Sequence, residues 1–214
     1  MKNKLNWVYL MLVIVLIAFL ILFIKYLYIF KLNEKLTLKN KELLQQMSLY
    51  KQQQNNFDSI YKKIYEQTKD KDKSLYLAVC INKVLNEIDS KFEFINENLV
   101  ISIIKVESNY DRTAQSSVGA MGYMQIKQST ADWLYKKYKL KIKPDLYKTY
   151  NNIYYGVFYL NYIANKLKNK YPKSILPALV LLAYNEGPNS KKVKRMSYAK
   201  HKYVNKVFNN IMLL

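Results

Sequence analysis

The stretch ILPALVLLAYNEGP, residues 175–188, predicts the centre of the fold. It is apolar on all sides of a helix as far as Tyr184, the pattern of a helix that is buried within a protein. Pro177 lies near the expected helix start and Gly187 just past the expected end, which is the usual asymmetry of helix boundaries. The stretch is too short to cross a membrane. We therefore predict a buried central helix in a mainly α domain.

Glycine is scarce, with four among 214 residues. All four lie in three short segments, which are GAMGYMQI (119–126), NIYYGVFYL (152–160) and AYNEGP (183–188). Glycine is kept where the backbone needs a positive φ or where another group must approach closely. We therefore expect GAMGYMQI to contain a tight turn, and the other two segments to contain close contacts or helix ends.

Two further stretches upstream have apolar residues at helical spacing, LYLAVCINKVLNEI (75–88) and NENLVISIIKVES (96–108). Asn96 or Asn98 is the expected N-cap of the second. Glu107 ends this apolar helix, so its carboxylate either reaches solvent or lies in a pocket that raises its pKa. No alternating strand pattern of any length appears.

The net charge of +20 favours acidic partners such as an anionic polymer, or reflects a solvated lysine-rich surface. We expect no nucleic-acid partner, because the lysines are scattered and no aromatic-basic motif of a nucleic-acid fold is present. The single cysteine, Cys80, lies in an apolar helical stretch and is expected to be a buried structural thiol. We expect no metal and no organic cofactor, because neither Cys80 nor the lone His201 has partners for a ligand cluster.

The N-terminal segment predicts a membrane anchor. Residues 7–24, WVYLMLVIVLIAFLILFI, carry no charge, and eighteen helical residues extend about 27 Å, close to the thickness of a bilayer core. Tyrosine or tryptophan flanks both ends, as in an aromatic belt. The following sequence offers no small-residue cleavage site, which disfavours a signal peptide. We assign 1–31 to a single-pass anchor; lysines on both sides leave its orientation undecided.

A heptad pattern follows the predicted anchor. Leu36, Leu43, Tyr50, Phe57 and Ile64 recur every seven residues, which is typical of a coiled-coil seam. We predict a long helix or weak coiled coil over 32–68, and a polar joint at 67–74, QTKDKDKS. The alternative is one amphipathic helix lying on its own domain or on the bilayer. The stalk and joint together cover 32–74, and the compact domain covers 75–214.

Several segments occur in an order that resembles a known family. After Glu107 and Ser108 come Ser116, then GAMGYMQI, NIYYGVFYL, AYNEGP and finally YVNKV (203–207). This order resembles the catalytic domain of lytic transglycosylases, which have a lysozyme-like fold and cleave bacterial cell-wall glycan. The resemblance covers roughly residues 75–210. It implies a mainly α, lysozyme-like helical domain, preceded here by a transmembrane helix and a long helical stalk.

The resemblance also implies roles for individual positions. Glu107 matches the family's single catalytic acid. The positions that match substrate-binding residues are Ser116, Gly122, Tyr123, Met124, Gln125, Tyr184 and Asn185. Met124 and Gln125 are expected to face the glycan, and Met124 and Tyr184 to raise the pKa of Glu107. Asn152 and Gly156 match a segment packed behind the site, and Asn152 and Glu186 are accessory candidates.

Three positions depart from the family pattern. Tyr123 replaces a leucine, where it either stacks on sugar or fills the core. Glu186 replaces a small residue, so it is either a solvated residue at a helix end or a second carboxylate that permits hydrolysis. Asp111 and Arg112 replace an Asn-Pro pair and are expected to alter only a loop.

The resemblance predicts a membrane-anchored lytic transglycosylase that cleaves the bond between N-acetylmuramic acid and N-acetylglucosamine in peptidoglycan and forms 1,6-anhydro ends. The alternatives are a muramidase-type hydrolase of the same fold, and a non-catalytic wall-binding scaffold of an envelope apparatus. A wall substrate places the N-terminus inside the bacterial cytoplasmic (inner) membrane and the catalytic domain on its periplasmic or extracytoplasmic side. Residues 32–68 are the expected surface for self-association or for an envelope partner.

Overall fold

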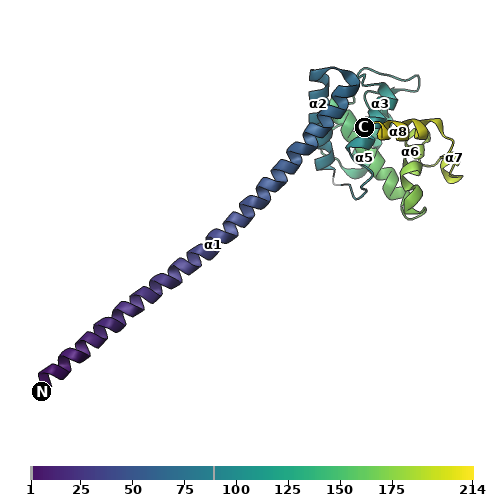
Figure 1. The fold of residues 1–214 in the computed structure, drawn as a ribbon. Helices are drawn as coiled ribbons and strands as arrows, with labels where there is room; N and C mark the ends of the chain where they lie inside the picture. Colours follow the sequence, from purple (N-terminus) through teal and green to yellow (C-terminus); the bar gives the residue numbers. More distant parts are fainter. Residues whose placement is uncertain (1, 89) are drawn as a thin grey trace. The chain divides into compact units, whose positions relative to one another are not determined.

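The computed structural model describes residues 2–88 and 90–214, and the chain is mainly α-helical, as predicted (Figure 1). The elements, in order, are α1 (Lys2–Thr68), α2 (Lys71–Glu87), α3 (Glu97–Ser108), β1 (Ala120–Met121), β2 (Ile126–Lys127), α4 (Gln128–Tyr138), α5 (Thr149–Leu167), the short 3₁₀ helix η1 (Lys173–Ile175), α6 (Leu176–Glu186), α7 (Lys191–Lys194) and α8 (Lys202–Met212). Contacts divide the chain into two units, residues 1–54 and 55–214, and each is described by itself.

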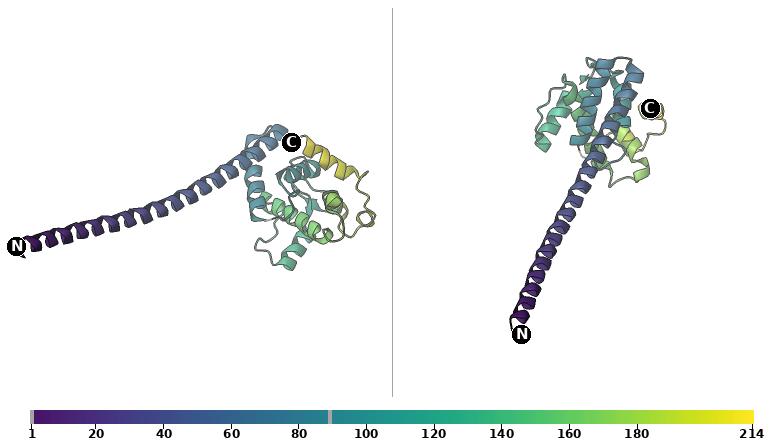
Figure 2. Two further views of the ribbon diagram at one scale, coloured as in Figure 1. Left: turned by 60° about the horizontal axis from the view of Figure 1, so that its bottom comes forward. Right: turned by 60° about the vertical axis from the view of Figure 1, so that its left-hand side comes forward.

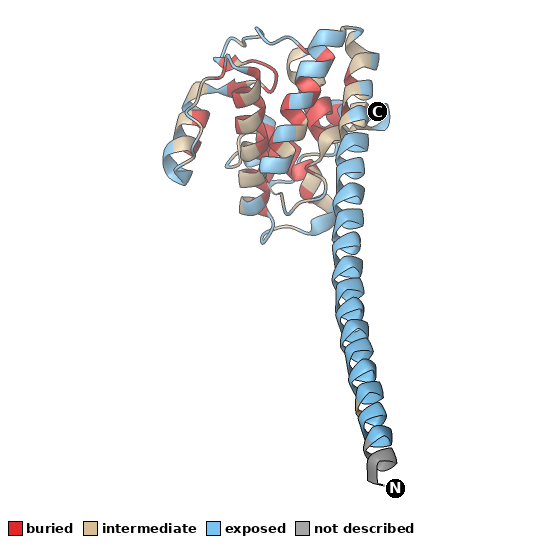
Figure 3. Cartoon of the chain, turned by 90° about the vertical axis from the view of Figure 1, so that its left-hand side faces the viewer, coloured by how far each residue is buried: buried red, intermediate tan, exposed pale blue. Residues whose placement is uncertain are grey.

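The N-terminal unit is helical throughout its described part and has no core of its own. From Trp7 to Gln54 the side chains are exposed, apart from the half-buried Val13, as the pale blue helix in Figure 3 shows. An 18-residue window of α1 has a mean hydropathy of 3.1. By length and composition this helix can cross a membrane, in agreement with the predicted anchor over 7–24.

The second unit begins inside α1, because the last turns of that helix supply core residues. Ile60 and Ile64 are fully buried, and Phe57 packs against the same core. The predicted heptad positions therefore differ in burial along α1, since Leu36, Leu43 and Tyr50 are exposed whereas Ile64 is buried. The non-helical joint between α1 and α2 is only residues 69–70, where Asp70 caps α2. The domain limits at 31 and 74 stay predictions.

Helix α6 is the buried central helix that the sequence predicts. Residues 179–183 are completely buried, Pro177 lies in the first turn, and Gly187 with φ of 85° ends the helix. The helix packs against α5 on one side and contacts α8, and α8 also packs along α3. Figure 2 gives two further views of these helices. This arrangement places the C-terminal ends of α3 and α6 in one compact unit.

The segment GAMGYMQI forms a small hairpin, which confirms the predicted tight turn. Its strands β1 and β2 pair antiparallel, with Ala120 opposite Lys127 and Met121 opposite Ile126. Strands of two residues are too short to show alternation, so the sequence did not predict them. Gly122 has φ of 73°, and a Cβ there would overlap the side chain of Asn152. A glycine is needed at this position for both reasons.

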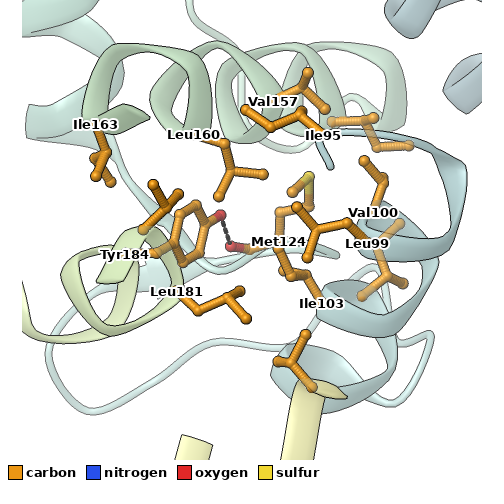
Figure 4. Packing of buried hydrophobic residues seen from close by; sticks show 14 of the residues in the cluster. Ile95, Leu99, Val100, Ile103, Met124, Val157, Leu160, Ile163, Leu181 and Tyr184 are labelled. Carbon is orange, nitrogen blue, oxygen red and sulfur yellow. Dashed lines mark hydrogen bonds between the residues drawn. The ribbon is translucent and has the colours of Figure 1, made fainter. Parts of the chain in front are cut away.

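The core behind the hairpin is built around Met124, whose side chain is completely buried (Figure 4). The Tyr184 hydroxyl donates a hydrogen bond of 2.8 Å to the Met124 carbonyl oxygen, drawn as the dashed line in Figure 4. A Cβ at Gly156 would collide with the Met124 side chain, so helix α5 can approach the hairpin only with glycine there. Cys80 is buried in the same core, as predicted, and burial raises the pKa of its thiol.

Candidate active site

Glu107 lies in the last turn of α3, which is fixed at both ends. The Asn96 side chain accepts a hydrogen bond of 3.2 Å from the Leu99 amide, which confirms Asn96 as the N-cap. At the other end, Asn109 leaves the helix with φ of 50°, and the Ser108 hydroxyl lies 3.0 Å from the Tyr123 carbonyl oxygen. The turn that carries Glu107 is therefore held against the hairpin.

A cavity of about 420 Å³ opens beside Glu107. Its walls come from the end of α3, the hairpin and its flanks, the start of α4, helix α5 and the end of α6. The lining residues are Glu107, Ser116, Val118, Ala120, Gln125, Ile126, Lys127, Thr130, Tyr159, Tyr184, Asn185, Glu186 and Gly187. Six predicted site residues are thus brought together around one cavity, although they come from three separate segments; these are Glu107, Ser116, Gln125, Tyr184, Asn185 and the accessory candidate Glu186.

The carboxyl group of Glu107 is poised to hold a proton near neutral pH. Burial raises its pKa from 4.5 to about 7, because the low-dielectric surroundings disfavour the charged form. The Tyr203 hydroxyl acts in the opposite direction and limits the rise. In the part of the chain that the structure describes, no lysine, arginine or histidine forms an ion pair with Glu107. A carboxylic acid of this kind can donate a proton to a bound molecule.

Two buried tyrosines surround this carboxyl group. Burial and the charge of Glu107 hold the pKa of both Tyr184 and Tyr203 well above the usual tyrosine value, so both stay neutral donors. Tyr184 uses its hydroxyl to anchor the Met124 carbonyl. The buried Tyr203 hydroxyl has no other hydrogen-bond partner among the described residues. It is therefore available to stabilise the charged form of Glu107, which lowers the pKa of that carboxyl group. Tyr203 was assigned no role from the sequence, although it begins the YVNKV segment.

The polar groups of the hairpin side are held by local hydrogen bonds. The Ser116 hydroxyl oxygen accepts a bond of 3.0 Å from the Ala120 amide, which orients the hydroxyl at the cavity wall. The Gln125 side-chain amide donates to the carbonyl oxygens of Ala114 at 2.9 Å and Gly122 at 3.0 Å. The Gln125 backbone has a positive φ of 48°, which costs energy for a residue other than glycine. Ser116 and Gln125 are thus held in fixed orientations at the cavity wall.

Four predicted site residues do not line the cavity. Met124 was expected to face the glycan, but its side chain is completely buried, since Gly156 leaves room for it in the core. Tyr123 is 4% exposed and packs in the core, which favours its core-filling reading over stacking on sugar. Gly122 packs against the buried Asn152, whose side chain binds backbone groups of the hairpin instead of a ligand. These residues shape the cavity from behind.

Glu186 is the last residue of α6 and is partly exposed, in line with a solvated residue at a helix end. Its side chain lines the cavity, and one oxygen, Oε1, lies 2.7 Å from Lys192 Nζ and 3.0 Å from His201 Nε2. The bonds from Lys192 and His201 lower the pKa of Glu186, so it is charged at neutral pH. The cavity therefore holds two carboxyl groups in contrasting environments. Over residues 2–88 and 90–214, no group of three His, Cys, Asp or Glu side chains is arranged to hold a metal ion.

The chain is similar to named lytic transglycosylases. It is 33% identical over 130 residues to "Membrane-bound lytic murein transglycosylase E" of Buchnera aphidicola subsp. Baizongia pistaciae, covering 58% of this chain and 60% of that protein. It is 28% identical over 113 residues to the protein of the same name from Buchnera aphidicola subsp. Acyrthosiphon pisum, covering 51% of each. The chain thus spans less than two thirds of the length of the curated relatives that it matches.

A solved structure and a family model also match. The structure of the lytic transglycosylase Slt from Pseudomonas aeruginosa, an inactive mutant, aligns with 62% of this chain and 20% of its own, at 20% identity and a TM-score of 0.45. The family model described as "Transglycosylase SLT domain" matches residues 85–206, more than half of the chain and all of the cavity-lining residues. The chain therefore belongs to the transglycosylase SLT domain family.

Proposed function

We propose that this protein is a membrane-anchored lytic transglycosylase that cleaves peptidoglycan between N-acetylmuramic acid and N-acetylglucosamine. The observation that carries the proposal is the half-buried Glu107 carboxyl group, with a pKa of about 7, at the wall of an open cavity. A polar ring of Ser116, Gln125 and Asn185 lines the same cavity and can bind sugar hydroxyl and acetamido groups. Membership of the family and the printed names of the relatives support the same activity.

In the proposed reaction, Glu107 acts first as an acid and then as a base. Its proton passes to the glycosidic oxygen, and the bond from C1 of the muramic acid unit to that oxygen breaks through an oxocarbenium-like transition state. The C6 hydroxyl of the same sugar then attacks C1, and the Glu107 carboxylate takes the hydroxyl proton. The new C1–O6 bond closes a 1,6-anhydro ring, no water is consumed, and Glu107 returns to its protonated form.

The surroundings of Glu107 suit both steps. Desolvation raises the pKa of Glu107, so the acid is protonated before the glycosidic bond breaks. The Tyr203 hydroxyl stabilises the Glu107 carboxylate that forms when the proton is transferred. A general acid works best when its pKa lies near the working pH, and a pKa of about 7 meets this condition. Positive charge accumulates on the sugar in the transition state, and the newly ionised Glu107 carboxylate stabilises it.

A muramidase-type hydrolase is the second candidate, because Glu186 supplies another carboxylate to the cavity. A hydrolase of this kind would use Glu186 to activate water or to stabilise a glycosyl intermediate. The ion pair with Lys192 and the hydrogen bond with His201 oppose this role, since they lower the basicity of the carboxylate. We therefore favour a mechanism with Glu107 alone, and the chemical form of the new glycan ends decides between the two.

The decisive experiment incubates the purified full-length chain in detergent with isolated peptidoglycan and identifies the new ends by mass spectrometry. Anhydro ends that are absent with Glu107→Gln support the proposal, and reducing ends support hydrolysis. Glu186→Gln is the matched control, because it changes the other carboxyl group of the same cavity. Binding of wall material without any cleavage by the wild-type chain would instead support the non-catalytic scaffold.

We infer that residues 7–24 anchor the protein in the bacterial cytoplasmic membrane, with the N-terminus inside and the compact unit outside, where peptidoglycan lies. The mean hydropathy of 3.1 and the exposed apolar side chains support a membrane span, and two relatives are named membrane-bound. Protease added to intact spheroplasts would digest the compact unit if this topology is right. Protection of that unit would place it in the cytoplasm and overturn the assignment.

The exposed part of α1 is proposed as a surface for self-association or for an envelope partner. Leu36, Leu43 and Tyr50 keep a seven-residue spacing and are exposed along this part of the helix. A cysteine introduced at Leu43 would form a crosslinked dimer in membranes if the helices pair along this seam. Absence of that crosslink, with a positive control in a known dimeric helix, would leave an envelope partner as the better interpretation.

A further inference from the structure

The single histidine of the chain joins the ends of two helices. His201 directly precedes α8, and its Nε2 lies 3.0 Å from Oε1 of Glu186, the last residue of α6. The intervening residues 187–200 form a loop that is mostly exposed and carries the four-residue helix α7. The contact between Glu186 and His201 therefore closes this loop where the chain returns to the compact unit.

The contact is sheltered from solvent, since the His201 side chain is 15% exposed and that of Glu186 is 25% exposed. The same Glu186 oxygen lies 2.7 Å from Nζ of Lys192 on α7. Because the lowered pKa of Glu186 leaves its carboxylate without a proton, the Nε2 of His201 carries the proton and donates the bond. The other ring nitrogen, Nδ1, is buried without a hydrogen-bond partner among the described residues. The polar contact that orients the ring is therefore the one with Glu186.

The start of α8 is not fixed by a capping side chain. Helices α2, α3 and α7 begin after Asp70, Asn96 and Ser190, whose side chains accept a hydrogen bond from a backbone amide of the first turn. His201 makes no such bond at the start of α8. A first turn without a capping side chain is less stable. The bond from His201 to Glu186 instead holds the first turn of α8 to the end of α6.

This first turn carries Tyr203, which lies two positions after His201. Tyr203 is 8% exposed, and its buried hydroxyl faces the carboxyl group of Glu107. Helix α8 packs along α3, which carries Glu107, and also contacts α6. Tyr184, two positions before Glu186, approaches the same carboxyl group from α6. The two helix ends that Glu186 and His201 join thus each bring a buried tyrosine to Glu107.

We propose that His201 is a positioning residue for the candidate acid: its bond to Glu186 fixes the first turn of α8 and thereby holds the Tyr203 hydroxyl beside Glu107. His201 is not among the residues that line the cavity, so it acts through Tyr203 and not on a bound molecule. Its partner Glu186 is a departure from the family pattern, which makes this tie a property of the present chain. The name of acid for Glu107 rests on the proposed function, whereas the link from His201 to Tyr203 does not.

The test follows the titration of Glu107 by carbon NMR of the glutamate carboxyl groups in the full-length protein in detergent, with Glu107→Gln identifying its signal. Among the described residues, Glu107 faces the hydroxyl groups of Tyr184 and Tyr203 and forms no ion pair. His201→Ala should raise the titration midpoint of Glu107, because the Tyr203 hydroxyl is no longer held beside the carboxylate that it stabilises. We expect between half and all of the shift that Tyr203→Phe causes.

The double variant separates positioning from a direct effect of the histidine charge. Adding His201→Ala to Tyr203→Phe should shift the midpoint no further, since the two changes act through one hydroxyl group. His201→Gln should restore most of the wild-type midpoint, because its amide can still donate to Glu186. Glu186→Ala should reproduce the shift, whereas Glu186→Gln keeps an acceptor oxygen for His201. Ser197→Ala, a change at an exposed position of the same loop, is the matched control and should leave the midpoint in place.

An unchanged midpoint in His201→Ala would overturn the proposal, and so would a shift that adds fully to that of Tyr203→Phe. If His201→Ala does not fold, Glu186→Ala breaks the same contact from the other side and gives the same readout. The result is separable from the proposed function, because the titration needs no substrate. The expected shifts in a chain that never cleaves peptidoglycan would support the link and refute the enzyme; anhydro ends without any shift would do the reverse.

Discussion

Glu107 and Glu186 line the same cavity, yet their surroundings give them opposite properties. Glu107 sits at the end of the buried helix α3 without a cationic partner among the described residues, and its pKa rises to about 7. Glu186 sits at the end of α6 beside Lys192 and His201, and its pKa is lowered. The comparison shows that neighbours and burial, and not the residue type, determine which carboxyl group can serve as an acid.

The largest expected effect is on catalysis. Glu107→Gln should lower the rate of peptidoglycan cleavage by about a thousandfold or more, because the glutamine cannot deliver a proton. Glu186→Gln should lower it less than about tenfold, since the ionised Glu186 delivers none. Turbidity loss of a peptidoglycan suspension measures both rates. Equal large losses would show that the two carboxyl groups act together, as in a hydrolase.

The same pair should differ in how stability depends on pH. The folded protein keeps the Glu107 proton up to about pH 7, whereas the unfolded chain loses it near pH 4.5. This contribution to the free energy of unfolding is complete below pH 4.5 and is lost as the pH rises to about 7. Glu107→Gln should therefore be more stable than the wild type by up to about 3 kcal/mol at pH 8, but not at pH 4.

Glu186 provides the control for that measurement, with the opposite sign. Its lowered pKa stabilises the fold above pH 4.5, and this contribution disappears as the pH falls through its folded pKa. Glu186→Gln should be less stable by under about 1 kcal/mol at pH 8, because the Lys192 side chain is 55% exposed and such pairs contribute little. Denaturant unfolding at both pH values tests the pair, and a stability gain in Glu186→Gln would contradict the comparison.

The next effect concerns the hairpin against which the last turn of α3, with Glu107, is held through Ser108. Asn152 accepts a hydrogen bond of 2.8 Å from the Met124 amide and donates to the carbonyl oxygens of Met121 at 2.8 Å and Leu146 at 3.2 Å. Asn152→Ala should lower the free energy of unfolding by roughly 2–3 kcal/mol, because buried backbone groups lose their partners. The neighbouring Asn151→Ala, which removes one bond, should cost less. Equal costs would show that the hairpin does not depend on Asn152.

The smallest effect is a shift in the pH profile of activity. Cleavage should decline as the pH rises above about 7, since Glu107 loses its proton. The Tyr203 hydroxyl holds the pKa of Glu107 down, so Tyr203→Phe should move this decline to higher pH. Tyr184→Phe should leave it in place, because the Tyr184 hydroxyl binds the Met124 carbonyl oxygen. A decline that does not move in Tyr203→Phe would exclude this tuning role.

Much of the fold is readable from local patterns. The capping of α3 by Asn96 and the limits of α6 between Pro177 and Gly187 follow from short-range chemistry, and the structure confirms them. The hairpin strands β1 and β2 were not predicted, because two residues are too few for a periodic signal. The first turns of the compact unit were also assigned to the stalk, since a heptad pattern looks the same whether it faces a partner helix or its own core.

The sequence by itself determined the apolar N-terminal helix and the helical stretches at 75–88, 96–108 and 175–186, because periodicity and capping are local properties of the chain. The order of its motifs resembles the family closely enough to single out Glu107 as the candidate acid. Only the tertiary structure decided which motif residues reach the cavity. It buried the Met124 side chain in the core, placed Glu186 within hydrogen-bond distance of His201, and brought Tyr203 close to Glu107. The reason is physical: the direction and charge environment of a side chain depend on contacts between segments that are distant in sequence.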